Sequence, residues 1–337
     1  MLMTTEPDPF GILDATRGVL ENARFVTMHP EAVPRAVEAV TKYFGSRLVE
    51  ANRAWPKVAA TFADCVQFVF LEDVVNFSFW ADPKKETWCV EWPKGNFVRG
   101  WYALDACFRR ALRSNARILN ARYLADMPYR DAKEFFMGVG GIPIPMECER
   151  LVNLCETGVV LLQYFDGHFR SILEEARYDA IALVRLLRFY FSSFNDQAML
   201  YNERDGMAVC TIVPFLKRAQ ICAYNLSDLA EHFPLFNIIN TDQLTAFADY
   251  RIPQILRALG MIVYSDKLAA KVGRGALLKP GSREEIEIRS ATVWGVELIR
   301  QNIPHHTAAQ IDNALWMICR DRSAAILPHH RTRTIFY

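Results

Sequence analysis

The sequence predicts a mainly α-helical protein with a small β-hairpin insert in its N-terminal half. Apolar residues recur three and four positions apart over most of the chain, which is the spacing of one helix face. Alternating residues flank a turn-forming segment at one place, residues 86–102. Of the 337 residues, 51% are hydrophobic and 12% are aromatic, so the chain can fill a sizeable core and is not disordered.

The charge balance restricts the class of partner. Thirty-nine basic and thirty-eight acidic residues give a formal net charge of +1. Because a nucleic-acid polymer is bound through many phosphate contacts, this balance argues against such a partner and leaves a small-molecule ligand. The eight cysteines form no Cys-x-x-Cys pair, and neither a signal peptide nor a long uncharged apolar run is visible. We therefore expect a cytoplasmic protein with reduced cysteines and no membrane span.

The N-terminal third begins with two expected helices between Asp14 and about Leu48. Asp14 can cap the first helix, and the second has apolar residues at helical spacing, namely Val33, Ala36, Val37, Val40 and Phe44. The next segment, DCVQFVFLEDVVNFSFW (64–80), is strongly apolar with few charges. It suits a buried strand or a buried helix, and periodicity alone does not decide between them.

The hairpin is expected in ETWCVEWPKGNFVRGWY (86–102), where two alternating runs flank Pro-Lys-Gly-Asn. An amphipathic helix follows in ALDACFRRALRSNA (103–116). From about Ala125 onward nearly every segment has helical periodicity, including residues 171–194 as one run.

We expect a single domain spanning residues 1–337. The glycine- and proline-rich segment MGVGGIPIPM (137–146) is the clearest turn region and the candidate boundary between two lobes. The first lobe, about 1–136, would carry the hairpin, and the second, about 147–337, would be all-helical.

Asp249 is the most informative single residue. It precedes Pro253 and a helical run that Gly260 closes, so it lies just ahead of a helix start. An acid at that place is usually a cap that accepts free backbone N–H groups. Because the preceding residues are apolar, Asp249 should also lie at the inner end of a buried turn, where an ionised carboxylate can stabilise a developing cation. The roles of cap and catalyst are compatible.

Several strings, in one order over nearly the whole chain, resemble the queuosine salvage family of queuosine 5′-phosphate N-glycosylase/hydrolases: FLEDVVNFSFW (70–80), GWYALDACFRRAL (100–112), PFLKRAQI (214–221), TAFADYRIPQILRALG (245–260), REEIEIRS (283–290) and WGVELIR (294–300). The resemblance implies a helical, glycosylase-like architecture. It also implies hydrolysis of queuosine 5′-monophosphate, and less well of queuosine, to queuine and ribose 5-phosphate, with no cofactor. The released queuine would be salvaged towards tRNA modification.

Asp249 and Lys217 are the catalytic candidates under this interpretation. Breaking an N-glycosidic bond builds positive charge on the sugar, and Asp249 can stabilise that charge, activate water or add covalently; the sequence leaves these three roles open. Lys217, in PFLKRAQI, would pair with Asp249, keep it ionised and lie near the substrate phosphate. A lysine at such a position also often extends only to solvent.

The base pocket is expected around the NFSFW motif. Phe77 would stack on the flat base while Ser78 bonds a base edge, although both also suit plain core packing. Tyr250 would cover the other face. Asp166, in QYFDGHF, can accept both donors of a guanine-type edge or face the ammonium arm of queuine, and its Asp-Gly turn is the alternative explanation. Asp73 is a weaker candidate for the same contact.

Arg251 is the expected phosphate-binding residue, with Arg331 and Arg333 as further candidates and solvated surface charge as the alternative. The adjacent histidine pairs, 305–306 and 329–330, lack acidic or cysteine partners at ligand spacing, so no metal site is expected. Two other function classes remain open from sequence alone. The first is a non-catalytic protein, either one that binds queuine or another nucleobase or a helical interaction scaffold. The second is a nucleic-acid glycosylase of helix-hairpin-helix type, which the near-zero charge disfavours.

Overall fold

The computed structural model describes residues 7–46, 61–114, 116–204, 207–322 and 325–337. Helices dominate these residues, which confirms the predicted fold class: α1 (Ile12–Glu21), α2 (Val33–Ser46), α3 (Phe62–Val74), α4 (Trp101–Ser114), α5 (Ala121–Ala125), α6 (Tyr129–Phe135), α7 (Glu147–Tyr164), α8 (Phe169–Glu175), α9 (Ala180–Tyr190), α10 (Lys217–Ser227), α11 (Ile252–Ala258), α12 (Asp266–Gly273), α13 (Arg283–Asn302) and α14 (Ala308–Arg322). None of the described helices combines the length and the apolar character needed to cross a membrane.

The strands form three antiparallel pairs: β1 (Val26–Met28) with β6 (Ile262–Tyr264), β2 (Cys89–Glu91) with β3 (Phe97–Arg99), and β4 (Gln197–Arg204) with β5 (Met207–Pro214). The predicted hairpin is β2–β3, in which Val90 lies opposite Val98. The β1–β6 pair joins segments far apart in the sequence and could not be found from local patterns.

The β4–β5 hairpin corrects the expectation that the chain beyond residue 147 is all-helical. In β4 the buried Leu200 stands between the exposed Met199 and Tyr201, whereas β5 is exposed from Val209 to Ile212 and buried at Val213 and Pro214. A period of two, as in β4, is the signature of a half-buried strand, and the sequence places Asp-Gly, a strong turn dipeptide, between the two runs. The turn signal was therefore present, and the helical interpretation of the neighbouring segments concealed it.

Two further local expectations are decided. The ambiguous segment 64–80 begins as helix α3, whose residues 65–74 are all buried; this explains why no single apolar face is visible. The run 171–194 is broken, because Arg177 and Tyr178 have left-handed φ values and Asp179 caps α9 by accepting the Ala182 N–H. The end of the second expected helix, at residues 47–48, lies outside the described residues.

The first helix is capped by a different acid from the one expected. Asp8 Oδ1 accepts the Ile12 N–H at 2.8 Å, and Asp8 Oδ2 accepts the Asp14 N–H at 3.0 Å. Asp14 lies inside the first turn of α1, where a negative charge still favours the positive end of the helix dipole.

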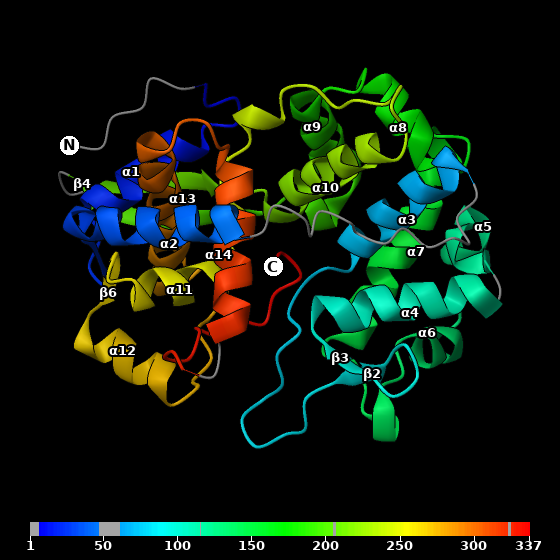
Figure 1. Ribbon diagram of the computed structural model, residues 1–337, viewed down its shortest axis with the longest axis horizontal. Helices are drawn as coiled ribbons and strands as arrows, with labels where there is room; N and C mark the ends of the chain where they lie inside the picture. Colours follow the sequence, from blue (N-terminus) through cyan, green and yellow to red (C-terminus); the bar gives the residue numbers. More distant parts are fainter. Residues whose placement is uncertain (1–6, 47–60, 115, 205–206, 323–324) are drawn as a thin grey trace.

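The helices form two groups side by side (Figure 1). One group contains α1, α2 and α11–α14, and the other contains α3–α10. Each group has a cluster of buried apolar side chains; α13 contributes to both clusters, and the buried apolar residues of α1 belong to the cluster of the second group. Elements from the two ends of the chain thus pack together in the first group. The expected lobe boundary at residues 137–146 stays a prediction.

Replacing Gly158 by alanine should strongly destabilise the second group. A Cβ at this position would lie 2.2 Å from the Ala125 backbone nitrogen and 2.6 Å from the Ala121 carbonyl oxygen, so α5 and α7 would have to move apart. We expect the free energy of unfolding in urea to fall by about 1–3 kcal/mol or more. Gly18, in α1, is the matched control because its added Cβ meets nothing within 4 Å, and Gly18→Ala should gain about 0.5–1 kcal/mol. Equal effects at the two positions would contradict this account.

Candidate active site

A cavity of about 760 Å³ lies between the two groups of helices. From the first group it is lined by α14 and by the segment 247–251, and from the second by one face of α10 along its length and by the start of α4. The segment 76–87 and residues of the C-terminal tail run between the groups (Figure 1) and complete the lining. The cavity therefore depends on six separate segments of the chain.

Two buried arginines fix the loop that follows α3. Arg150 of α7 donates to the carbonyl oxygens of Val75 and Phe77, and Arg218 of α10 donates to those of residues 73 and 74. The last carbonyl groups of a helix have no partner within the helix, so these guanidinium groups replace the missing donors. The loop beginning at Asn76 is thereby held at the cavity in one conformation.

Asp249 is buried and lines the cavity. Its Oδ1 accepts the backbone N–H groups of Arg251 at 2.7 Å and Ile252 at 2.9 Å, which caps α11. Burial raises the pKa of the Asp249 carboxyl, and the nearby Lys217 ammonium and these two N–H groups oppose that increase. The side chain is therefore an acceptor fixed in place beside a cation.

Lys217 is the first residue of α10 and is also buried at the cavity, not extended to solvent. Its Nζ donates to the Asn76 carbonyl oxygen at 3.4 Å. Burial lowers the pKa of Lys217, and the negative charge of Asp249 opposes that change. Within the described residues the two side chains form no direct ion pair, so the expected pairing is corrected to an electrostatic one across the cavity.

A buried ion pair behind the cavity connects the backbones that carry these two residues. Arg289 of α13 donates to both carboxylate oxygens of Asp196, at 2.8 and 2.6 Å. Arg289 Nε also donates to the carbonyl oxygen of Ala248, and Asp196 accepts the Lys217 backbone N–H, each at 3.0 Å. The pair therefore fixes the position of Lys217 relative to the peptide that precedes Asp249.

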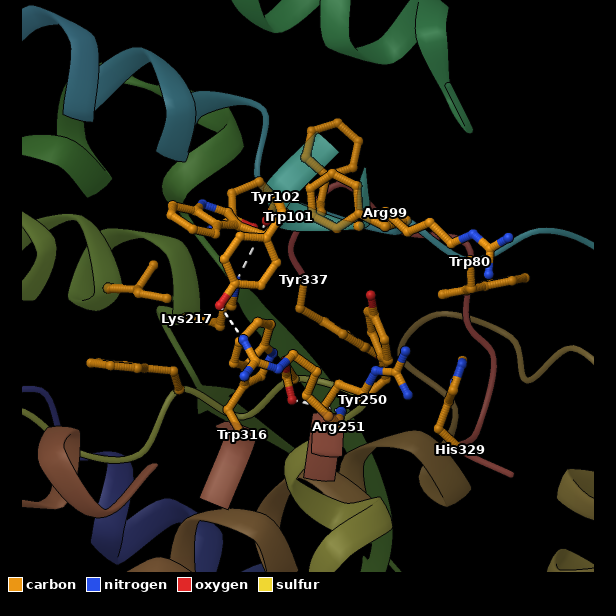
Figure 2. Close-up of a pocket in the computed structure, with 18 of the residues that line it drawn as sticks. Trp80, Arg99, Trp101, Tyr102, Lys217, Tyr250, Arg251, Trp316, His329 and Tyr337 are labelled. Carbon is orange, nitrogen blue, oxygen red and sulfur yellow. Dashed lines mark hydrogen bonds between the residues drawn. The ribbon is translucent and has the colours of Figure 1, made fainter. Parts of the chain in front are cut away.

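Aromatic side chains form two walls of the cavity. Trp80, Tyr250 and Tyr337 pack together on one side, with the His329 ring 4.6 Å from that of Tyr250. Trp101, Tyr102 and Trp316 form the other wall, and Figure 2 shows Lys217 on the same side of the cavity as this second group. Such surfaces suit a ligand with a flat ring.

Phe77 and Arg251, both expected at the site, line the same cavity. The Phe77 ring is buried, with the guanidinium carbon of Arg150 4.1 Å from its centroid. Arg251 Nη1 donates to the Gln254 side chain at 3.1 Å, and its guanidinium lies 5.6 Å from the Tyr250 ring. Of the tail arginines, Arg331 lines the cavity.

Two expected base contacts are corrected by the structure. Asp166 is exposed in the turn after α7 with a left-handed φ of 52°, and it does not line the cavity. The turn explanation therefore holds for this residue. Ser78 is fully buried, and its hydroxyl donates to the Thr334 carbonyl oxygen at 2.9 Å, so it fastens the C-terminal tail and is not directed at a ligand. The third candidate, Asp73, is buried and accepts from the side chains of Asn76 and Asn225.

Replacing Ser78 by alanine should therefore lower stability without changing substrate affinity. The variant loses one buried hydrogen bond and leaves the Thr334 carbonyl oxygen with one donor fewer, which costs about 1–2 kcal/mol of unfolding free energy. Denaturation in urea measures the first effect and KM the second. A raised KM at unchanged stability would instead place the hydroxyl on the substrate.

Three cavity-lining residues of α14 were not expected from the sequence. Asp312, Trp316 and Arg320 are spaced by four residues, so they lie on one face of the helix, and all three line the cavity. The available signal was an acid, an aromatic residue and a cation at helical spacing. Among the described residues, no group of three or more histidine, cysteine, aspartate or glutamate side chains is arranged to hold a metal ion.

The fold and this site define a class: a mainly helical enzyme whose cavity holds a carboxylate and an ammonium group between aromatic walls, suited to a small ligand with a flat ring. The family described as queuosine salvage protein matches residues 56–337, and the chain belongs to this family. It is 36% identical to the queuosine 5′-phosphate N-glycosylase/hydrolase of Sphaerobacter thermophilus, over 99% of this chain and 100% of that protein. The proteins of the same name from Mus musculus and Schizosaccharomyces pombe are 32% and 30% identical, over 98% and 81% of this chain and 99% and 83% of their own lengths.

Proposed function

We propose that the protein hydrolyses the N-glycosidic bond of queuosine 5′-phosphate, and less readily that of queuosine. The products are queuine, which can be salvaged towards tRNA modification, and ribose 5-phosphate. The observation that carries the proposal is the nearly full-length similarity to queuosine 5′-phosphate N-glycosylase/hydrolases in a chain whose cavity contains a fixed, buried carboxylate.

The sugar side of the reaction is assigned to Asp249 and Lys217. As the bond breaks, positive charge develops on the ribose, and a carboxylate that is already oriented stabilises it without reorganisation. Two backbone N–H groups engage Asp249 Oδ1, while no hydrogen bond from the described residues engages Oδ2, which is thus available to the sugar or to the attacking water. Lys217 keeps Asp249 ionised through its charge.

The base and the phosphate are assigned to the surrounding walls. Phe77 and Tyr250 provide aromatic surface for the flat 7-deazaguanine ring. Arg251, next to Tyr250, provides the guanidinium group for the 5′-phosphate. We expect the reaction in the cytoplasm, because the eight cysteines are all free thiols, which suits a reducing compartment.

The test is incubation of the purified protein with queuosine 5′-phosphate, with detection of queuine and ribose 5-phosphate by mass spectrometry. Stoichiometric appearance of both products supports the proposal. Saturable binding of queuine without formation of ribose 5-phosphate would identify a binding protein instead. The absence of both binding and turnover would overturn the assignment.

A further inference from the structure

A second carboxyl group, that of Asp312 on α14, is held beside the one assigned to the sugar. Asp312 lines the same cavity and is only 4% exposed. Its Oδ2 accepts the backbone N–H of Phe247 at 2.9 Å, and Phe247 stands two residues before Asp249. This bond attaches the Asp312 side chain to the segment that carries Asp249, so the distance between the two carboxyls is set by a single short loop.

The environments of the two carboxyls differ in a definite direction. Asp249 accepts two backbone N–H groups, whereas Asp312 accepts one. Burial raises the pKa of both; that of Asp312 lies well above its ordinary value because the negative charge of Asp249 adds to the effect of burial, with Phe247 N–H and Lys217 opposing it. Asp312 is therefore the member of the pair that keeps a proton when Asp249 is ionised.

Cleavage of the bond requires this asymmetry. The glycosidic electron pair leaves with the base, and a 7-deaza ring has carbon at the position where a purine offers N7 for protonation. A proton must then be delivered to another nitrogen or oxygen of the leaving base. Two carboxyls of opposite protonation state, one for the sugar and one for the leaving group, are the arrangement that glycosidases use.

We propose that Asp312 is the general acid of the reaction, an inference that rests on the proposed function. As the C1′–N bond breaks, Asp312 donates its carboxyl proton to the departing base, while the Asp249 carboxylate stabilises the ribosyl cation. Water then adds to C1′ and its surplus proton returns to the Asp312 carboxylate. One water is consumed, and both side chains return to their starting states.

The experiment compares two leaving groups in the wild type, Asp312→Asn and Asp249→Asn. One substrate is queuosine 5′-phosphate, whose base needs a proton; the other is 4-nitrophenyl β-ribofuranoside 5-phosphate, whose nitrophenolate departs without one. We expect Asp312→Asn to lose about 10²- to 10⁴-fold in kcat on the nucleotide but less than about fivefold on the nitrophenyl substrate. Asp249→Asn should lose activity on both. Asparagine still accepts the Phe247 N–H, so the cavity is expected to keep its shape.

A pH profile provides an independent measurement on the nucleotide alone. The acid must be protonated, so wild-type kcat/KM should fall as pH rises through the raised pKa of Asp312. The charged and titratable groups that face it are Asp249, Lys217 and the Tyr224 phenol of α10. The alkaline decline should disappear in Asp312→Asn and persist in Asp312→Glu. An unchanged decline in Asp312→Asn, or equal losses on the two substrates, would overturn the assignment of the acid. Failure of the wild type to cleave queuosine 5′-phosphate would instead overturn the proposed function.

Discussion

Asp249→Asn should abolish turnover while leaving the fold intact. Asparagine is as good a helix cap as aspartate, and its side-chain oxygen can still accept the N–H groups of Arg251 and Ile252. What the variant lacks is the negative charge opposite the ribosyl cation. We expect kcat for queuosine 5′-phosphate to fall by at least about 10³-fold, with little change in the thermal unfolding temperature.

The matched control is Asp166→Asn, which makes the same chemical change at an exposed turn outside the cavity. Its kcat and KM should equal those of the wild type. The sequence is compatible with both a capping and a catalytic role for Asp249. Stability measures the first role and kcat the second, so the two variants together separate them. Loss of stability with full specific activity in the remaining folded Asp249→Asn protein would leave Asp249 as a cap only.

The largest effect on stability is expected for Arg289→Met. This change removes both hydrogen bonds to the Asp196 carboxylate, which is 1% exposed, and the bond to the Ala248 carbonyl oxygen. A buried carboxylate that has lost its cation costs about 3–5 kcal/mol of unfolding free energy. Urea denaturation measures the loss, and any folded fraction should have low kcat because Lys217 and Asp249 are no longer fixed relative to each other.

Arg170→Met provides the control for this variant, because Arg170 pairs with Glu174 on the surface of α8, where the two side chains are 52% and 49% exposed. Removing an exposed ion pair should cost at most about 0.5 kcal/mol. The double variant Asp196→Asn/Arg289→Met removes the stranded charge as well and should recover much of the stability. A double variant as unstable as Arg289→Met would show that the charge itself is not the cause.

The helical class could be predicted because most helices of the protein pack an apolar stripe against a core. Such a stripe appears in the sequence as apolar residues three and four positions apart. The segments that could not be predicted differ from these helices in how they are buried. α3 is buried on every side, so its apolar residues show no period, and its identity depends on what surrounds it. The β4–β5 hairpin is exposed along most of β5, from Val209 to Ile212, so no apolar-polar alternation marked that strand in the sequence.

Among the site residues, the string around Asp249 was found. Trp80, Trp101 and Tyr102 were missed although they lie in quoted motifs, and the residues of α14 were missed as well. Asp249, Tyr250 and Arg251 are neighbours in one string, and all line the cavity. Asp166 was chosen for what a carboxylate can bind, and its position in the turn after α7 keeps it away from the cavity. Asp312 had no such motif, because its importance arises only from the Phe247 N–H and the Asp249 charge beside it.

The sequence by itself determined the helical class, the β2–β3 hairpin, the family resemblance and the acid at the start of α11. Each of these depends on residues that are close in the chain. Only the tertiary structure decided that Lys217 faces Asp249 across a cavity, that Ser78 fastens the C-terminal tail, and that α14 brings a second carboxyl. The reason is physical: burial and the charge of a neighbour set the protonation of a carboxyl, and both are supplied by segments that only folding brings together.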